Sequence, residues 1–161
     1  MPDLWMEKII QDIKEKNHEA AKKIMREEHE KKVIAEKAPM FWRAFADFLE
    51  KHTREIEDGL HGDITQGELS FALKPENHEI TLGKSAFPSV QFTATPQFND
   101  GKVSMNLGKV NPIATKGMSF SQIPCRFEVQ SDDTLILQLN GHSYPSPEDA
   151  ARFIIERAFT L

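Results

Sequence analysis

Apolar positions recur at helical spacing through a highly charged N-terminal segment. Residues 3–37 contain neither glycine nor proline, and their Glu, Lys, Ala, Ile and Met residues favour an α-helix. Positions spaced alternately by four and three residues form a seam along this helix, and its members are Met6, Ile10, Ile13, Asn17, Ala20, Ile24, Glu27, Lys31, Ile34 and Ala38. The seam resembles a heptad stripe that is apolar in its first part and then becomes polar.

The length of this predicted helix decides how it sits on the rest of the protein. A helix of about 35 residues would be about 50 Å long, whereas the remaining ~120 residues would form a body roughly 35 Å across. An unbroken helix would therefore overhang the body. Either it bends near Asn17 or within residues 26–32, or it projects and meets a helix from another copy or another protein.

A second helix is predicted over residues 40–58, because Pro39 is expected to end the first one. Its apolar side chains recur at spacings of three and four and form one stripe, consisting of Phe41, Phe45, Phe48, Leu49, His52 and Ile56. Gly59 follows as a C-cap. Trp42 lies off this stripe, so it either packs beneath the first helix in a helical hairpin or belongs to an intermolecular contact.

Between residues 67 and 140 the apolar period changes from helical to alternating. This alternation predicts short strands over residues 69–73, 79–82, 90–98, 103–107, 125–129 and 135–139. Asn99, Asp100 and Gly101 form a strong hairpin signal between two of them. Residues 108–121 are predicted to be a loop, and they would act as a lid if a ligand bound beneath them.

The C-terminal helix carries clear start signals. Ser146 is predicted as its N-cap and Pro147 as its first residue. The helix is expected over residues 147–159, with a wide apolar face for packing on the sheet.

The order of these elements predicts an α+β fold. Residues 1–38 would form a long charged helix or arm, and residues 39–161 a single domain. In that domain the helices over residues 40–58 and 147–159 would lie on one face of the sheet. The sheet, within residues 67–140, would have five to six mostly antiparallel strands.

Composition narrows the partners and the compartment. Of 161 residues, 39% are hydrophobic and 28% charged, and the net charge is -5, so no basic field exists to attract nucleic acid or anionic lipid. The one cysteine, Cys125, has no partner for an internal disulfide. No apolar run is long enough to span a bilayer. We therefore predict a cytoplasmic protein that binds neither nucleic acid nor a membrane.

Two arrangements of ionisable residues suggest chemistry, and both are incomplete. Glu15 and His18 match the Glu-x-x-His spacing of di-iron bundles, but one copy lacks the other ligands, so we predict no metal or other cofactor. His52, His61 and Asp63 would form an acid–base set only if their side chains converged. The same residues are explained without catalysis by the end of a helix, a turn, and a histidine at the edge of an apolar stripe. An enzyme therefore ranks third, behind the two functions described next.

The pattern favours a non-enzymatic interaction module that self-associates, for example as a homodimer, or binds a partner protein through its N-terminal helices. The side chains expected at that interface are Leu4, Trp5, Ile9, Ile10, Ile13, Ile24 and Trp42. The alternative is a binding protein for a small apolar ligand, suggested by eleven Phe beside one Tyr and two Trp. Its pocket between sheet and helices would be lined by Phe41, Phe45, Phe48, Phe92, Met105, Met118 and Phe127. An ordinary filled core explains the same composition.

Overall fold

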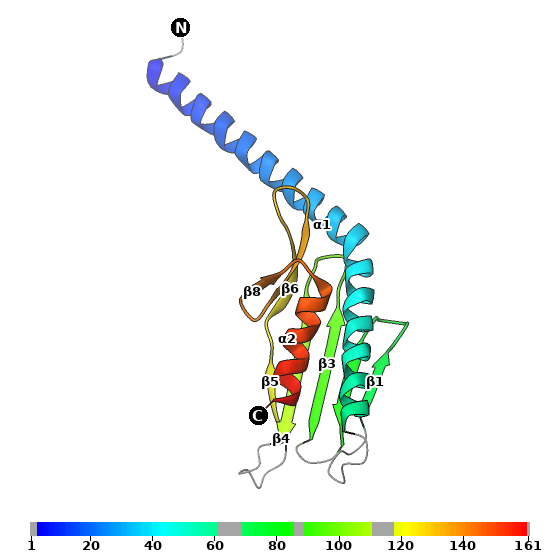
Figure 1. Ribbon diagram of the computed structural model, residues 1–161. Coiled ribbons are helices and arrows are strands. Elements are labelled where there is room, and N and C mark those ends of the chain that lie inside the picture. The colour runs from blue at the N-terminus through cyan, green and yellow to red at the C-terminus, as the bar shows by residue number, and fades with distance from the viewer. Residues whose placement is uncertain (1–2, 61–68, 86–88, 111–117, 161) are drawn as a thin grey trace.

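One very long helix dominates the computed structural model, which describes residues 3–60, 69–85, 89–110 and 118–160 (Figure 1). These residues form an α+β fold with two helices and eight strands. The helices are α1 (Leu4–Gly59) and α2 (Pro147–Phe159). The strands are β1 (Leu69–Leu73), β2 (Ile80–Lys84), β3 (Val90–Pro96), β4 (Val103–Val110), β5 (Met118–Gln122), β6 (Cys125–Val129), β7 (Leu135–Leu139) and β8 (His142–Tyr144).

Helix α1 continues through Pro39 as a single helix of 56 residues, so the expectation of three helices is wrong. A proline inside a helix removes one hydrogen bond and costs about 3 kcal/mol. Side chains on both sides of it are buried against the body, among them Ile34, Ala38 and Trp42, and this packing outweighs the local cost. Figure 1 shows α1 changing direction in its cyan part, which by residue number contains Pro39. The helix also crosses residue 38, so no break in secondary structure marks the predicted division there.

The strands form two antiparallel sheets where one sheet of five to six strands was expected. The larger sheet has the order β1-β2-β3-β4-β5 and the smaller one β6-β7-β8. The chain passes from one to the other through Ile123 and Pro124. Because proline has no backbone N–H to donate to a ladder, Pro124 favours the end of β5 pairing at this point. A single bridge between Lys102 and Arg126 joins the two sheets.

The predicted hairpin at residues 99–101 is confirmed. It joins β3 to β4, which pair from Val90–Lys109 to Pro96–Val103, and Gly101 adopts a positive φ of 80°. The predicted loop over residues 108–121 is shorter than expected, because β4 runs to Val110 and β5 begins at Met118. Residues 111–117, which make up the middle half of the predicted lid, lie outside the described residues.

Helix α2 begins and ends at the predicted residues. The backbone N–H of Asp149 donates to Ser146 Oγ at 3.4 Å, so the predicted N-cap satisfies one of the free donors of the first turn. Four side chains of this helix are buried: Ala150, Ala151, Ile154 and Ala158. They are the small and β-branched members of the predicted apolar face, and they allow α2 to approach α1 and the sheet.

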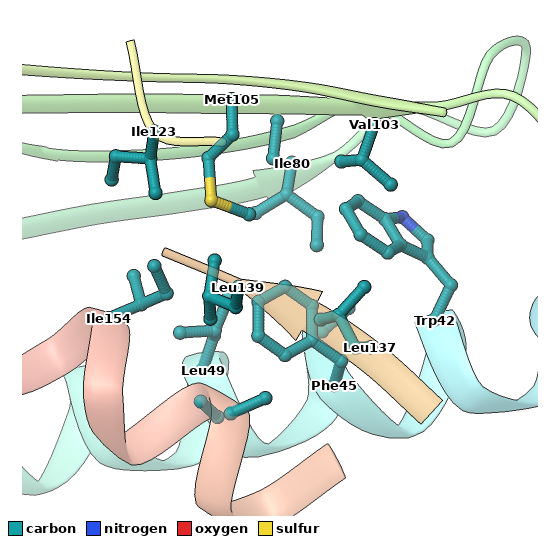
Figure 2. Close-up of a cluster of buried hydrophobic side chains, with 14 of the residues drawn as sticks. Trp42, Phe45, Leu49, Ile80, Val103, Met105, Ile123, Leu137, Leu139 and Ile154 are labelled. Carbon is teal, nitrogen blue, oxygen red and sulfur yellow. The ribbon is translucent and has the colours of Figure 1, made fainter. Parts of the chain in front are cut away.

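The hydrophobic core lies between the helices and the sheets (Figure 1). Figure 2 shows Trp42, Phe45 and Leu49 of α1 pointing toward side chains of the larger sheet. Those sheet residues include Ile80, Val103 and Met105, and Leu137 and Leu139 of β7 lie in the same cluster. The opposite face of the larger sheet carries a polar row that runs in register across β2, β3, β4 and β5. Its members are Thr81, Thr93, Asn106 and Gln122.

Candidate functional site

The first half of α1 forms an arm that projects from the body (Figure 1). Every residue from 3 to 29 is exposed, and the first buried side chains of the helix are those of Val33 and Ile34. At a rise of about 1.5 Å per residue the exposed part is roughly 40 Å long. The alternative in which the helix folds back on the body is therefore not the one this structure adopts. We call residues 4–28 the arm.

Large apolar side chains are exposed along the arm. Their exposed fractions run from 39% for Met6 to 84% for Leu4, and the full set is Leu4, Trp5, Met6, Ile9, Ile10, Ile13, Ile24 and Met25. Single exposed apolar residues are common on soluble proteins, whereas several on one face favour an interaction surface. Five of these side chains follow the seam and share one face of the helix, namely Met6, Ile9, Ile10, Ile13 and Ile24, whereas Leu4, Trp5 and Met25 lie off that face.

The base of the arm is fixed to the body by contacts with the turn between β6 and β7. His29 Nε2 lies 2.9 Å from Asp133 Oδ2, and Lys37 Nζ donates a hydrogen bond to the Asp133 carbonyl oxygen at 2.8 Å. Ile34 packs next to Gly101. A Cβ atom added at Gly101 would lie only 3.0 Å from Ile34 Cδ1. These contacts extend from His29 to Lys37, over about two helical turns, so they hold the direction in which the arm leaves the body.

Six of the seven residues predicted for the interface lie exposed on the arm, and Trp42 does not. Trp42 is 1% exposed, and its ring centroid lies 5.2 Å from that of Phe45 and 6.3 Å from that of Phe127. Its Nε1 donates a hydrogen bond to the carbonyl oxygen of His78 at 2.7 Å. The second apolar side of this helix is therefore covered by strands of the same chain. Met6 and Met25 were missing from the predicted interface, although Met6 belonged to the seam.

The residues predicted to line a ligand pocket pack against one another in the core. Phe45, Phe92, Met105 and Phe127 are at most 1% exposed, and Phe41 meets Phe127 edge-to-face with centroids 5.6 Å apart. Phe48 is partly buried against the same cluster. The side chain of Met118 lies outside the described residues.

A surface groove of about 560 Å³ lies between α1 and the edge strand β1. Its apolar floor includes Trp42, Phe71 and Leu73, and charged residues such as Arg43 and Glu50 stand at its rim. The groove is close to the buried Trp42 and far along α1 from the arm. None of the residues predicted to line the ligand pocket lines this groove.

Of the acid–base set considered in the sequence, only His52 lies within the described residues. His52 Nδ1 lies 3.3 Å from Glu55 Oε2, and its buried Nε2 has no hydrogen-bond partner. His61 and Asp63 lie outside the described residues. Among the residues that the structure describes, no group of three or more His, Cys, Asp or Glu side chains is placed to hold a metal ion. Burial raises the pKa of the Cys125 thiol to about 12, so this side chain is neutral at physiological pH.

Comparisons with protein-family models, with curated proteins and with solved structures find no match for this chain. Within the described part of the chain, no helix combines the length and the apolar character needed to cross a membrane. Among the described residues, the exposed face of the arm is the feature that most resembles a binding site, because it carries large apolar side chains at helical spacing.

Proposed function

We propose that this protein is a non-enzymatic interaction module that self-associates through its N-terminal arm. The observation that carries the proposal is the set of large apolar side chains left exposed on the seam face of the projecting helix, namely Met6, Ile9, Ile10, Ile13 and Ile24. The body of the same chain does not cover this face, because its contacts with α1 begin at residue 29. A second helix docked along the row would remove these side chains from water.

The size of the apolar row supports an association of moderate strength. Five seam or near-seam side chains per chain are 39% to 56% exposed: Met6, Ile9, Ile10, Ile13 and Ile24. Burying the exposed half of each would contribute roughly 1 kcal/mol, hence roughly 10 kcal/mol for two chains. Bringing two molecules together costs an estimated ~4–15 kcal/mol. Dimer formation is therefore expected to depend on protein concentration.

The charge of the arm favours a protein partner over a lipid surface. Helices that lie on anionic membranes carry an excess of Lys and Arg on their polar face. The first turns of the arm carry acidic and basic residues in near balance, namely Asp3, Glu7, Asp12 and Glu15 with Lys8, Lys14 and Lys16. Opposite charges on the flanks of an apolar seam are instead typical of helices that pair with each other.

The ligand-binding alternative has less support. Its Phe and Met residues are buried against each other, and a side chain already in contact with its neighbours has no free surface to offer a ligand.

Light scattering over a range of protein concentrations tests the proposal. We expect the full chain to approach the mass of a dimer, and the double variant Ile10→Lys/Ile13→Lys to remain a monomer, because two charges would be buried in the contact. Both isoleucines are about half exposed, so the fold of the body should be unchanged by circular dichroism. The matched control is Glu15→Lys, which introduces the same side chain on the opposite face.

A full chain that stays monomeric at every concentration would contradict the proposal. So would a double variant that associates as strongly as Glu15→Lys, because the contact would then lie elsewhere.

A further inference from the structure

We infer that the second copy on the arm lies parallel to the first and in register, so that Asn17 of one chain faces Asn17 of the other. This inference rests on the proposed self-association and adds its geometry. The seam follows heptad positions a and d. Position a holds Ile10, Asn17 and Ile24, and position d holds Met6, Ile13 and Ala20.

The residue types at position a favour two parallel strands. One asparagine among apolar a residues selects both the register and the number of strands. Asn17 is exposed in the single chain. In a parallel pair the two Asn17 side chains meet across the axis and hydrogen-bond to each other, so neither is left unsatisfied. Any shift by one heptad would place Asn17 against isoleucine.

Charges beside the seam point to the same orientation. In a parallel pair Lys23 at position g lies next to Glu28 at position e of the other chain, and this attraction occurs twice. Neither side chain forms an ion pair within the described part of its own chain. Both are therefore available to a second copy.

An antiparallel pair would bring like charges together. In such a pair Ile10 of one chain faces Ala20 of the other, and Asn17 faces Ile13. Lys14 then lies near Lys14 of the other chain, and Lys16 near Lys16. Like charges at such positions are destabilising, and Asn17 would be buried against an apolar side chain without a partner. This antiparallel arrangement is therefore less stable, both in its charge contacts and in the burial of Asn17.

The body limits how far a parallel partner can follow the seam. It contacts the base of the arm through His29, Val33 and Lys37, and Glu27 and Lys31 of the seam line a groove whose other wall includes Arg126 and Glu128 of β6. Lys31, on the seam, is exposed, whereas Ile34 is buried by the body. The two helices must therefore separate near residues 27–28, where the seam becomes polar and like charges of the two chains would otherwise meet. Two bodies would then stand at the same end of a short two-stranded stalk.

Spin-label distances distinguish the two orientations. Position f holds Lys8, Glu15 and Lys22, all exposed and pointing away from the seam. Each would be replaced in turn by Cys and labelled, and the unchanged chain would serve as the control for labelling at the partly buried Cys125. A parallel, in-register dimer gives the same interspin distance at all three positions. An antiparallel dimer gives a short distance at residue 15 and adds an axial offset of roughly 20 Å at residues 8 and 22.

The outcomes separate this inference from the proposed function. Three equal distances in a chain with the mass of a dimer support both. Unequal distances in a dimer overturn the parallel geometry and leave self-association standing, whereas a monomeric mass with no interspin distance contradicts both.

A charge exchange tests the predicted contact between Lys23 and Glu28 independently. Lys23→Glu and Glu28→Lys should each weaken the dimer by about three- to tenfold, because attraction is replaced by repulsion at two solvent-exposed pairs. The double variant should recover most of the loss, and Lys22→Glu at position f should leave the dissociation constant unchanged. A double variant that dimerises as weakly as either single variant would overturn the contact.

Discussion

Replacing Gly101 by alanine should destabilise the protein more than the same replacement at Gly141. The two glycines have nearly the same backbone conformation, with φ of 80° and 84°. A Cβ atom in this left-handed region costs about 1 to 2 kcal/mol. Gly141 has open space where its Cβ would be, with no atom within 4 Å. Gly141→Ala therefore measures the cost of the conformation alone, about 1 kcal/mol.

At Gly101 the added Cβ atom would also meet the body and the base of the arm. It would lie 3.0 Å from Ile34 Cδ1 and 3.1 Å from the carbonyl oxygen of Phe127. The end of the Ile34 side chain can rotate away, but the carbonyl belongs to β6. That strand is held close by the Phe127 N–H, which donates to the Gly101 oxygen at 2.7 Å. Overpacking of this kind costs about 1 to 3 kcal/mol, so the total for Gly101→Ala is about 3 kcal/mol.

Urea and thermal unfolding, followed by near-ultraviolet circular dichroism at one protein concentration, measure the difference. For a chain of this length we expect the melting temperature to fall by about 3 °C for Gly141→Ala and about 9 °C for Gly101→Ala. Equal losses at the two sites would refute the argument, because they would show that the close approach between the hairpin, the arm base and β6 is not rigid.

Three further predictions concern the core, the thiol and the last helix. Trp42→Phe should lower the free energy of unfolding by about 2 kcal/mol, because the carbonyl of His78 loses its donor; an unchanged urea midpoint would contradict this. Since burial raises the pKa of Cys125 to about 12, its neutral thiol should react with a disulfide reagent at pH 8 far more slowly in the folded chain than in urea, and equal rates would be inconsistent with this. Ser146→Ala should cost about 1 kcal/mol by removing the acceptor for the Asp149 N–H, while Ser146→Asp should retain most of the stability.

Local signals predicted the parts of the fold whose causes are local. Ser146 and Pro147 marked the start of α2 because a cap and a fixed φ act on the residues beside them. The hairpin at Gly101 followed from the backbone that its turn requires. The alternating rows, such as Val103, Met105 and Leu107, gave the face of each strand, since side chains on a strand alternate whatever the sheet around them.

Other parts depended on energies that a local pattern does not contain. Pro39 was read as a helix end, but packing of Ala38 and Trp42 on the body outweighs one missing hydrogen bond. Strand β5 lay within a predicted loop, although Met118, Ser119, Phe120 and Ser121 alternate between apolar and polar. This stretch is short, and its pairing with the preceding strand β4 stabilises it.

The candidate site also has one part that local sequence predicts and one part that depends on long-range packing. The sequence by itself determined that one face of the N-terminal helix is apolar, because helical spacing places those residues together in any environment. Only the tertiary structure decided which part of the face is covered: Ile24 is 56% exposed and Ile34 is 5% exposed, although both belong to the same seam. The turn between β6 and β7 and the hairpin at Gly101 reach α1 at its middle and no further. Whether a position is buried depends on which segments, distant in the sequence, pack against it. For that reason the tertiary structure was needed to show where the exposed arm ends.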